Sequence, residues 1–236
     1  MKYFNFDLLD VDVSNITALN EEQFALARRH GLGASDTSAV LGLMDKFRGP
    51  EDVMENKLAI GYTDEEAAVS KKPNVKKGRD LEPLILKKAS EHFDKRIIKP
   101  SDMYRLKKYP WLTINYDGLM MTDEGMIPVE CKWVSTYADK YYKFGQQSDV
   151  LFERLPKEIT KEAFINRAEQ IGIPPYYYCQ VQQQLMGTEA PYAWLAVLRD
   201  KTWELEVFKV PSSPELQEFI ATETYKFWSR VERQRT

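Results

Sequence analysis

The feature that most constrains the fold is a pair of opposite charges inside an apolar segment. Glu130 and Lys132 alternate with Val129, Cys131 and Trp133. Side chains alternate across a β-strand, so both charges would lie on the same face of a strand. Burying a carboxylate and an ammonium group costs several kcal/mol unless they pair with each other or bind a metal ion. The segment therefore predicts a strand that carries a polar site on one face.

A second carboxylate, Asp117, precedes this strand at a distance that suits a hairpin. Twelve residues separate Asp117 from Glu130, and Thr122–Gly125 predicts a tight turn between strands at Trp111–Met121 and Met126–Trp133. Both carboxylates and the lysine would then meet at one end of a sheet. Oxygen ligands without histidine or thiolate select Mg²⁺ or Mn²⁺. A lysine beside such an ion can orient an attacking water, and this combination is typical of metal-assisted phosphodiester hydrolysis.

An ordinary protein surface is the alternative explanation of this spacing. A surface aspartate in a turn, followed by an exposed glutamate–lysine pair on an edge strand, has the same pattern, and the bare spacing often occurs by chance. The apolar neighbours of Glu130 and Lys132 favour the buried site.

Length and composition exclude several classes of protein. The chain of 236 residues suits one large domain, which we expect to span residues 1–236. No apolar run is long enough to cross a membrane, and the N-terminus lacks the apolar region of a signal peptide. Two cysteines, Cys131 and Cys179, are too few for a disulfide framework or a four-cysteine metal site, and His30 and His92 are too few for a histidine-rich one. We expect a protein of the reducing cytoplasm.

The distribution of charge favours a polyanionic partner although the net charge is −3. Residues 1–70 carry 6 basic and 13 acidic side chains, whereas residues 71–108 carry 13 basic and 5 acidic ones. Phosphate binding needs local rather than global positive charge. The alternative is a solvated helix face that has no ligand.

The order of the expected elements predicts an α/β or α+β domain with a central mixed β-sheet flanked by helices. The expected helices span Asn20 (as N-cap) to Arg29, Thr37–Leu43 with Ser35 or Asp36 as its cap, 50–60, Gly78–Phe93, about 160–170, Pro174–Met186, and a C-terminal helix after Ser212. Further strands are expected at Ile97–Ile98, Tyr104–Leu106, Tyr192–Arg199 and Trp203–Val210. Residues 62–75 are expected to form a loop, and Pro83 to kink the long helix or mark its start near Glu82.

Five short motifs together resemble the lambda exonuclease and YqaJ-type viral recombinase family of the PD-(D/E)xK nuclease superfamily. They occur in the family's order and cover roughly residues 20–200. The motifs are Arg28-Arg29 with Gly31–Asp36, Gly78–Pro83, Asp117–Leu119, Glu130–Lys132 and Tyr178–Gln182.

The resemblance implies a restriction-endonuclease-like core and a Mg²⁺-dependent 5′→3′ exonuclease that acts on double-stranded DNA ends. Such an enzyme leaves 3′ single strands for a strand-annealing recombination protein. The family also implies a ring-shaped homotrimer in the cytoplasm of a bacterial host of a phage or prophage. The alternatives are an endonuclease of the same superfamily and a catalytically silent DNA-binding module.

The resemblance also assigns roles to residues of the site. The positions implied as metal-binding are Asp117, Glu130, Cys131 and Glu82, and Glu82 would serve a second metal ion or its water shell. Lys132 would activate the attacking water. For Glu82 the alternative is an ordinary acidic residue on a helix surface.

A second group of residues would contact DNA. Arg28, Ser35 and Gln180 resemble positions that contact the terminal 5′-phosphate, and Asn115 and Gln184 would add further DNA contacts. An arginine fork and a hydroxyl near a helix N-terminus suit a phosphate. The alternatives are an arginine and a serine that only cap helix ends, and a neutral polar surface for the glutamines.

The sequence departs from the family pattern at two places. Tyr116 stands where the superfamily has a proline before the first aspartate. Residues 137–172 form an expected insertion that could contact DNA, a subunit or a recombination partner. Within it, Lys140–Phe144 mixes cations with aromatic rings, which suits stacking on unpaired bases. The alternative is an ordinary amphipathic surface segment, which has the same composition.

Overall fold

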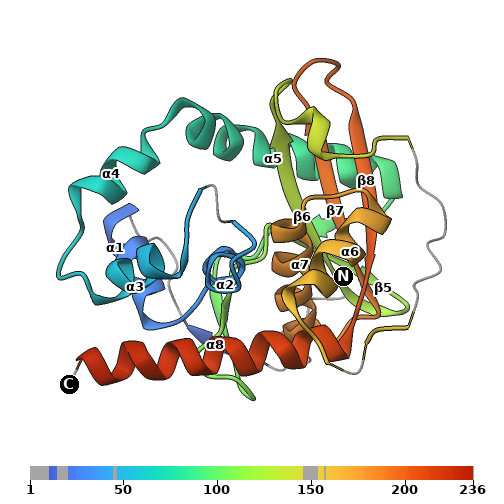
Figure 1. The fold of residues 1–236 in the computed structure, drawn as a ribbon. Helices are drawn as coiled ribbons and strands as arrows, with labels where there is room; N and C mark the ends of the chain where they lie inside the picture. The colour runs from blue at the N-terminus through green and yellow to red at the C-terminus, as the bar shows by residue number, and fades with distance from the viewer. Residues whose placement is uncertain (1–10, 15–20, 45–46, 146–153, 157, 236) are drawn as a thin grey trace.

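The central feature is a five-stranded mixed sheet with helices on both faces (Figure 1), which confirms the predicted fold class. The computed structural model describes residues 11–14, 21–44, 47–145, 154–156 and 158–235. The strand order is β2-β5-β6-β7-β8, and only the pairing of β6 with β7 is parallel. The strands are β2 (Ile97–Ile98), β5 (Gly118–Thr122), β6 (Gly125–Val134), β7 (Tyr192–Arg199) and β8 (Leu205–Pro211).

The parallel pairing at the centre requires a long connection between β6 and β7. This connection contains α6 (Lys161–Ile171) and α7 (Pro175–Thr188). The segment expected as an insertion, residues 137–172, forms its first part and contributes the short η3 (Asp139–Tyr141) and α6. The described part of this segment therefore belongs to the crossover that places α7 on the sheet.

Helices α5 (Pro73–Phe93) and α7 cover opposite faces of the sheet, as alternation along β6 shows. The Nζ atom of Lys77, on α5, lies 4.4 Å from the centre of the Trp133 ring. The Nζ atom of Lys132, the preceding strand residue, lies 5.0 Å from the centre of the Tyr177 ring on α7. Successive side chains of β6 thus meet different helices, and Glu130 shares the α7 face with Lys132.

Helix α5 is longer than predicted, since it begins at Pro73 and continues through Pro83. Proline inside a helix removes one backbone hydrogen bond and costs about 3 kcal/mol. The turns that follow bury Ile85, Leu86 and Ala89 in the core. Tertiary packing of this apolar face outweighs the local preference, so the expected start near Glu82 was wrong, while the kink expected at Pro83 stays a prediction.

A short helix, α4 (Asp64–Ser70), occupies half of the segment that the sequence predicted as a loop. The Thr63 hydroxyl accepts a hydrogen bond from the Glu66 N–H at 3.2 Å, and the Glu66 carboxylate accepts one from the Thr63 N–H at 2.9 Å. This reciprocal capping box starts the helix and explains why the loop prediction was wrong.

The single strand expected at Trp111–Met121 is divided between two sheets. Thr113–Ile114 forms β4 of a small sheet ordered β1-β3-β4, and β5 begins only at Gly118. Between them, the buried Tyr116 donates its hydroxyl to the Gln184 carbonyl oxygen at 3.0 Å. The break places Asp117 at the start of β5. The small sheet also contains β3 (Met103–Leu106) and β1 (Val11–Ser14), and β1 was not predicted.

The remaining helices pack beside the small sheet, and α8 extends along one side of the molecule (Figure 1). They are α1 (Glu21–Ala27), η2 (Arg28–His30), α2 (Ala34–Val40), α3 (Pro50–Leu58) and α8 (Pro214–Arg235). The expected cap Asn20 lies outside the described residues. Helix α2 starts three residues earlier than predicted, because Asp36 is its third residue and accepts the N–H of Gly33 at 3.1 Å. Within the described chain, no helix has both the length and the apolarity to span a membrane.

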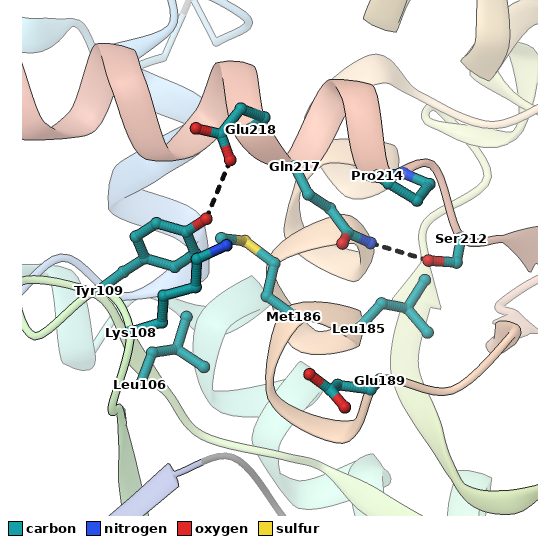
Figure 2. A pocket seen from close by; sticks show the side chains of 10 residues that line it. All are labelled: Leu106, Lys108, Tyr109, Leu185, Met186, Glu189, Ser212, Pro214, Gln217 and Glu218. Atoms are coloured by element: carbon teal, nitrogen blue, oxygen red, sulfur yellow. Dashed lines mark hydrogen bonds between the residues drawn. The ribbon is translucent and has the colours of Figure 1, made fainter.

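A pocket of about 310 Å³ lies between the C-terminal end of α7 and the start of α8 (Figure 2). It is bordered by two side-chain hydrogen bonds, from Tyr109 to Glu218 at 3.0 Å and from Gln217 to Ser212 at 2.9 Å. None of the residues that the motifs single out lines this pocket. The pocket is therefore separate from the candidate site.

Gly118 provides a test of the packing between α5 and the sheet. A Cβ atom there would lie 2.6 Å from methyl groups of both Ile97 and Leu86. We expect Gly118→Ala to lower the free energy of unfolding by about 1–3 kcal/mol, the usual cost of overpacking, measured by urea denaturation. The matched control is Gly78→Ala on α5, where an added Cβ would meet no heavy atom within 4 Å, and it should not destabilise the protein.

Candidate active site

Two carboxylates meet where β5 begins beside β6. Asp117 immediately precedes β5, and the pairing of Gly118 with Val129 brings it next to Glu130. The carboxylate of Asp117 accepts the Cys131 N–H at 2.8 Å. The hairpin geometry that the sequence predicted thus brings the two acidic residues together.

Glu130 is held from two sides on the α7 face of β6. Only 5% of the residue is exposed. One carboxylate oxygen forms an ion pair with the Nζ atom of Lys132, and the other accepts a hydrogen bond from the side-chain amide of Gln184 at 2.5 Å. These contacts fix the orientation of a charged group that would otherwise be costly to bury.

Burial and mutual repulsion govern the electrostatics of the acidic group. Desolvation raises the pKa of Asp117 well above its usual range, and the nearby Glu130 raises it further. For Lys132, burial would lower the pKa, but the attraction of Glu130 and Asp117 outweighs it, and the pKa is raised. Lys132 therefore stays protonated here and acts as a fixed positive charge beside two carboxylates.

Glu82 approaches this group from α5. Its charge contributes to the raised pKa of Asp117, so the two carboxylates are within electrostatic reach. Its own carboxylate is paired with the Nζ atom of Lys99 at 2.5 Å. The described residues contain no set of three or more histidine, cysteine, aspartate and glutamate side chains that could hold a metal ion by themselves.

The donor set nevertheless fits a hard cation at Asp117 and Glu130. Two desolvated carboxylates repel each other there, and a divalent cation would relieve that repulsion with the oxygen ligands it prefers. The side-chain oxygen of Gln184, whose amide nitrogen contacts Glu130, is buried without a hydrogen-bond partner. Two carboxylates supply fewer ligands than a magnesium ion requires, so main-chain oxygens or waters would complete the shell.

The thiol of Cys131 does not face the carboxylates, and the metal-binding role that the resemblance implies for this position stays a prediction. Its thiol belongs to the hydrophobic core, because alternation points it away from the face of Glu130 and Lys132. Burial raises the pKa of the thiol, and the neighbouring Asp117 raises it further. The sulfur is therefore protonated and a poor ligand, whereas the main-chain N–H orients Asp117.

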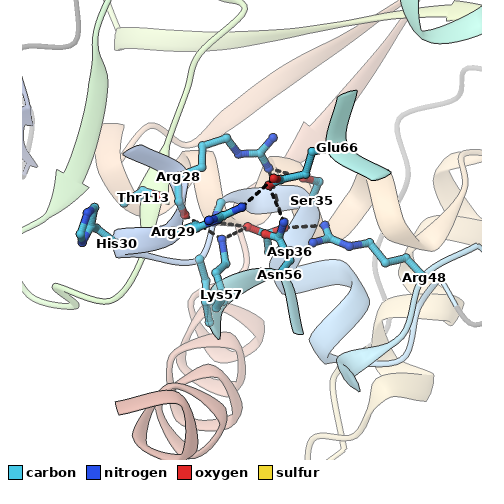
Figure 3. A network of polar contacts seen from close by, with 12 residues as sticks. Arg28, Arg29, His30, Ser35, Asp36, Arg48, Asn56, Lys57, Glu66 and Thr113 are labelled. Carbon is cyan, nitrogen blue, oxygen red and sulfur yellow. Dashed lines mark hydrogen bonds and ion pairs between the residues drawn. The ribbon is translucent and has the colours of Figure 1, made fainter. Parts of the chain in front are cut away.

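A second polar cluster surrounds the buried Asp36 (Figure 3). Lys57 and Arg48 contact its carboxylate at 2.7 and 2.5 Å, and Arg28 lies 3.7 Å away. Arg28 also donates to the Ser35 hydroxyl at 3.0 Å. The structure therefore brings the predicted pair of Arg28 and Ser35 together and adds two cations that the sequence did not reveal.

This cluster carries excess positive charge, with three cations around one carboxylate. Burial opposes ionisation of Asp36, but Lys57 and Arg28 outweigh it and lower its pKa below the usual range. Burial lowers the pKa of Lys57 to about 8, even though Asp36 favours the charged form. The side chain of Arg28 is 37% exposed and that of Arg48 28%, so both can still contact a ligand.

Helix α7 connects the two clusters. Its Tyr176 carbonyl oxygen accepts the Ser38 hydroxyl of α2 at 2.8 Å, while the next residue, Tyr177, contacts Lys132. Gln180, one turn further, is 7% exposed. Gln184 is more deeply buried, and its side-chain amide donates to the Glu130 carboxylate. In this structure the side chain therefore orients Glu130 and is not exposed to solvent. Asn115 is exposed at the break before β5.

Sequence comparison identifies the chain's relatives. A model of the YqaJ-like viral recombinase domain matches residues 23–191. The uncharacterized protein YqaJ of Bacillus subtilis is 23% identical over 219 residues, which cover 89% of this chain and 56% of that protein. The chain thus spans little more than half the length of this relative.

Structural comparison identifies a shared fold. Two structures of an alkaline exonuclease (LHK-Exo) from Laribacter hongkongensis, one of them in complex with dAMP, superpose with TM-scores of 0.62 and 0.61. They are 16% and 17% identical and cover 90% and 91% of this chain and 93% and 94% of those chains.

The repulsion between buried carboxylates gives a prediction that needs no activity assay. Asp117→Asn should stabilise the metal-free protein by about 1–3 kcal/mol, because it removes a buried like charge while the amide oxygen can still accept the Cys131 N–H. Mg²⁺ should raise the melting temperature of the wild type, since a ligand of the folded state stabilises it, but not that of the variant. Calorimetry with and without Mg²⁺ measures both effects, and the control is Asp123→Asn in the exposed turn of the hairpin. Equal Mg²⁺ shifts in wild type and Asp117→Asn would contradict a ligand role for Asp117.

Proposed function

This chain belongs to the YqaJ-like viral recombinase domain family, and we propose that it is a Mg²⁺-dependent exonuclease that degrades double-stranded DNA from its 5′ ends. The observation that carries the proposal is the convergence of Asp117, Glu130 and Lys132 beside one helix, α7. The shared fold with an alkaline exonuclease supports a nuclease. The relative in complex with dAMP supports a mononucleotide product.

The proposed chemistry depends on five side chains. Asp117 and Glu130 would hold the metal ion, which when bound supplies a Lewis acid and lowers the pKa of a ligated water. Lys132 keeps its proton beside Glu130, so it orients the attacking water and attracts the scissile phosphate as a cation. Gln184 fixes the direction of the Glu130 carboxylate. Glu82, whose charge reaches Asp117, would serve a second ion or its water shell, as the family resemblance implies.

The proposed polarity depends on the cluster around Asp36. Its excess positive charge and the exposed fork of Arg28 suit a terminal phosphate. Since α7 contacts both clusters, a phosphate held at Arg28 and Ser35 would place the strand end at a fixed separation from Glu130. A 5′-phosphate handle would then set the direction of digestion.

The biological setting is proposed from the family. Digestion of one strand would leave 3′ single strands for an annealing protein in recombination of the phage type, inside the bacterial cytoplasm. We propose the ring-shaped homotrimer of the family as the assembly. An endonuclease of the same superfamily and a silent DNA-binding module are the competing functions.

One assay separates these functions. In the presence of Mg²⁺ the protein should degrade linear duplex DNA and leave closed circular duplex intact, whereas an endonuclease cuts both and a silent module cuts neither. Asp117→Ala, Glu130→Ala and Lys132→Ala should each lower the rate at least about a hundredfold, the scale for losing a metal ligand or a cation that stabilises the developing charge. Asp123→Ala in the hairpin turn is the control. Near-full activity of Lys132→Ala would disprove the assigned mechanism.

The phosphate handle gives a separate prediction. The wild type should digest 5′-phosphorylated ends faster than 5′-hydroxyl ends, and Arg28→Ala should remove most of this difference, a loss of about 2–4 kcal/mol for one partner of a desolvated charge pair. Initial rates on two duplexes that differ only in the terminal phosphate measure it. Arg96→Ala, an exposed arginine outside the cluster, should preserve the preference. Equal wild-type rates on both duplexes would leave Arg28 and Ser35 as helix-end residues only.

A further inference from the structure

Gly78 lies on the side of α5 that faces the protein, yet nothing packs against it. Residues at helical spacing share a face, so Gly78 lies in line with Glu82, Ile85 and Ala89. Ile85 and Ala89 are 1% and 0% exposed against the sheet. At Gly78, however, a Cβ atom would meet no heavy atom within 4 Å. The inward face of α5 therefore continues beyond the core over open space.

The neighbours of Lys77 and Glu82 show where this open space lies. Just before Gly78, Lys77 contacts Asp200 at 2.6 Å and covers the Trp133 ring at 4.4 Å, at the end of β6. One helical turn after it, Glu82 lies within electrostatic reach of Asp117. The open face at Gly78 is therefore beside the candidate active site, on the side where α4 and α5 extend past the sheet (Figure 1).

The charge of the first half of α5 and of the two residues before it favours a polyanion. Residues 71–80 contain five cations and one acidic residue, Asp80, which pairs with Lys76 at 3.0 Å. The cations are Lys71, Lys72, Lys76, Lys77 and Arg79. Apart from Lys77, all of them are exposed. Residues 71–80 thus place excess positive charge on both sides of Gly78, which has no side chain.

The fold itself does not require glycine at this position. Its backbone is helical, φ is not in the left-handed region, and no neighbour would clash with a methyl group. Glycine is disfavoured inside helices relative to alanine. A residue that weakens its own helix without helping the packing points to a function that needs the space.

We propose that the sugar–phosphate backbone of a DNA strand passes against the main chain of α5 at Gly78 as it enters the active site. The missing side chain lets the strand approach the helix closely, between the cations of residues 71–79 and the carboxylate of Glu82. The inference rests on the proposed nuclease function and adds a path for the strand that no motif residue defines. Gly78 is a positioning residue in this scheme and does not touch the reacting atoms.

Side chains of increasing size at Gly78 test the proposal. Gly78→Ala should raise the melting temperature by about 2 °C, since alanine favours the helix, and lower both DNA affinity and digestion rate about threefold to tenfold. Gly78→Leu should lower both at least about a hundredfold while the protein remains folded. Affinity is measured on duplex ends with Ca²⁺ in place of Mg²⁺, and rates with Mg²⁺. The matched control is Ala68→Leu, which places the same leucine side chain on the exposed side of α4 and should keep wild-type affinity and rate.

The outcomes separate this inference from the proposed function. Wild-type affinity and rate in Gly78→Leu, within twofold, would overturn the strand path but not the nuclease. A lower melting temperature of Gly78→Ala would show that the fold needs glycine there and would also overturn it. If the wild type binds duplex ends without digesting them, the nuclease proposal fails and the affinities alone decide the strand path. If it neither binds nor digests DNA, both proposals fall.

Discussion

The charged pair on β6 is the constraint on which the rest of the structure depends. Glu130 is almost fully buried in the central strand, and it is tolerable there only because Lys132 and Gln184 contact its two oxygens. Gln184 can reach it only if α7 lies in one register along the sheet. That register is held by Tyr116, whose hydroxyl binds the Gln184 carbonyl oxygen, and by Tyr177 over Lys132. The site and the packing of its covering helix are therefore the same set of contacts.

The same helix fixes the position of the N-terminal part. Gln183 donates to the carbonyl oxygens of Leu32 and Thr113, which ties α7 to the loop before α2 and to the small sheet. Ser38 adds a hydrogen bond to the main chain of Tyr176. Gln182, Gln183 and Gln184 of α7 thus act as buried connectors. A helix that joins two polar clusters through side chains this well enclosed keeps their separation constant, which a mobile loop could not do.

Local patterns predicted what depends on neighbouring residues in the sequence. The alternation of charges around Cys131 located the strand and the face of the site, and the hairpin spacing placed Asp117 beside it. The capping box of Thr63 and Glu66 was equally local and could have been found. The break before Gly118 could not, because it depends on contacts between Tyr116 and a distant helix. The burial of Lys57 against Asp36 is likewise set by tertiary packing, since lysine is rarely buried without a partner.

Both clusters contain a surplus of one kind of charge, negative in the first and positive in the second. In the first, Asp117, Glu130 and the nearby Glu82 outnumber the lysine beside them, and in the second, cations outnumber Asp36. In each cluster, repulsion between the surplus like charges lowers the free energy of unfolding, since like charges repel more strongly away from water. A cation at the first and an anion at the second would relieve both surpluses. A phosphodiester chain that carries a metal ion at one phosphate and a free phosphate at its end supplies both, at a separation that α7 sets. Binding of such a substrate would therefore remove the charge repulsion that destabilises the folded protein at both clusters.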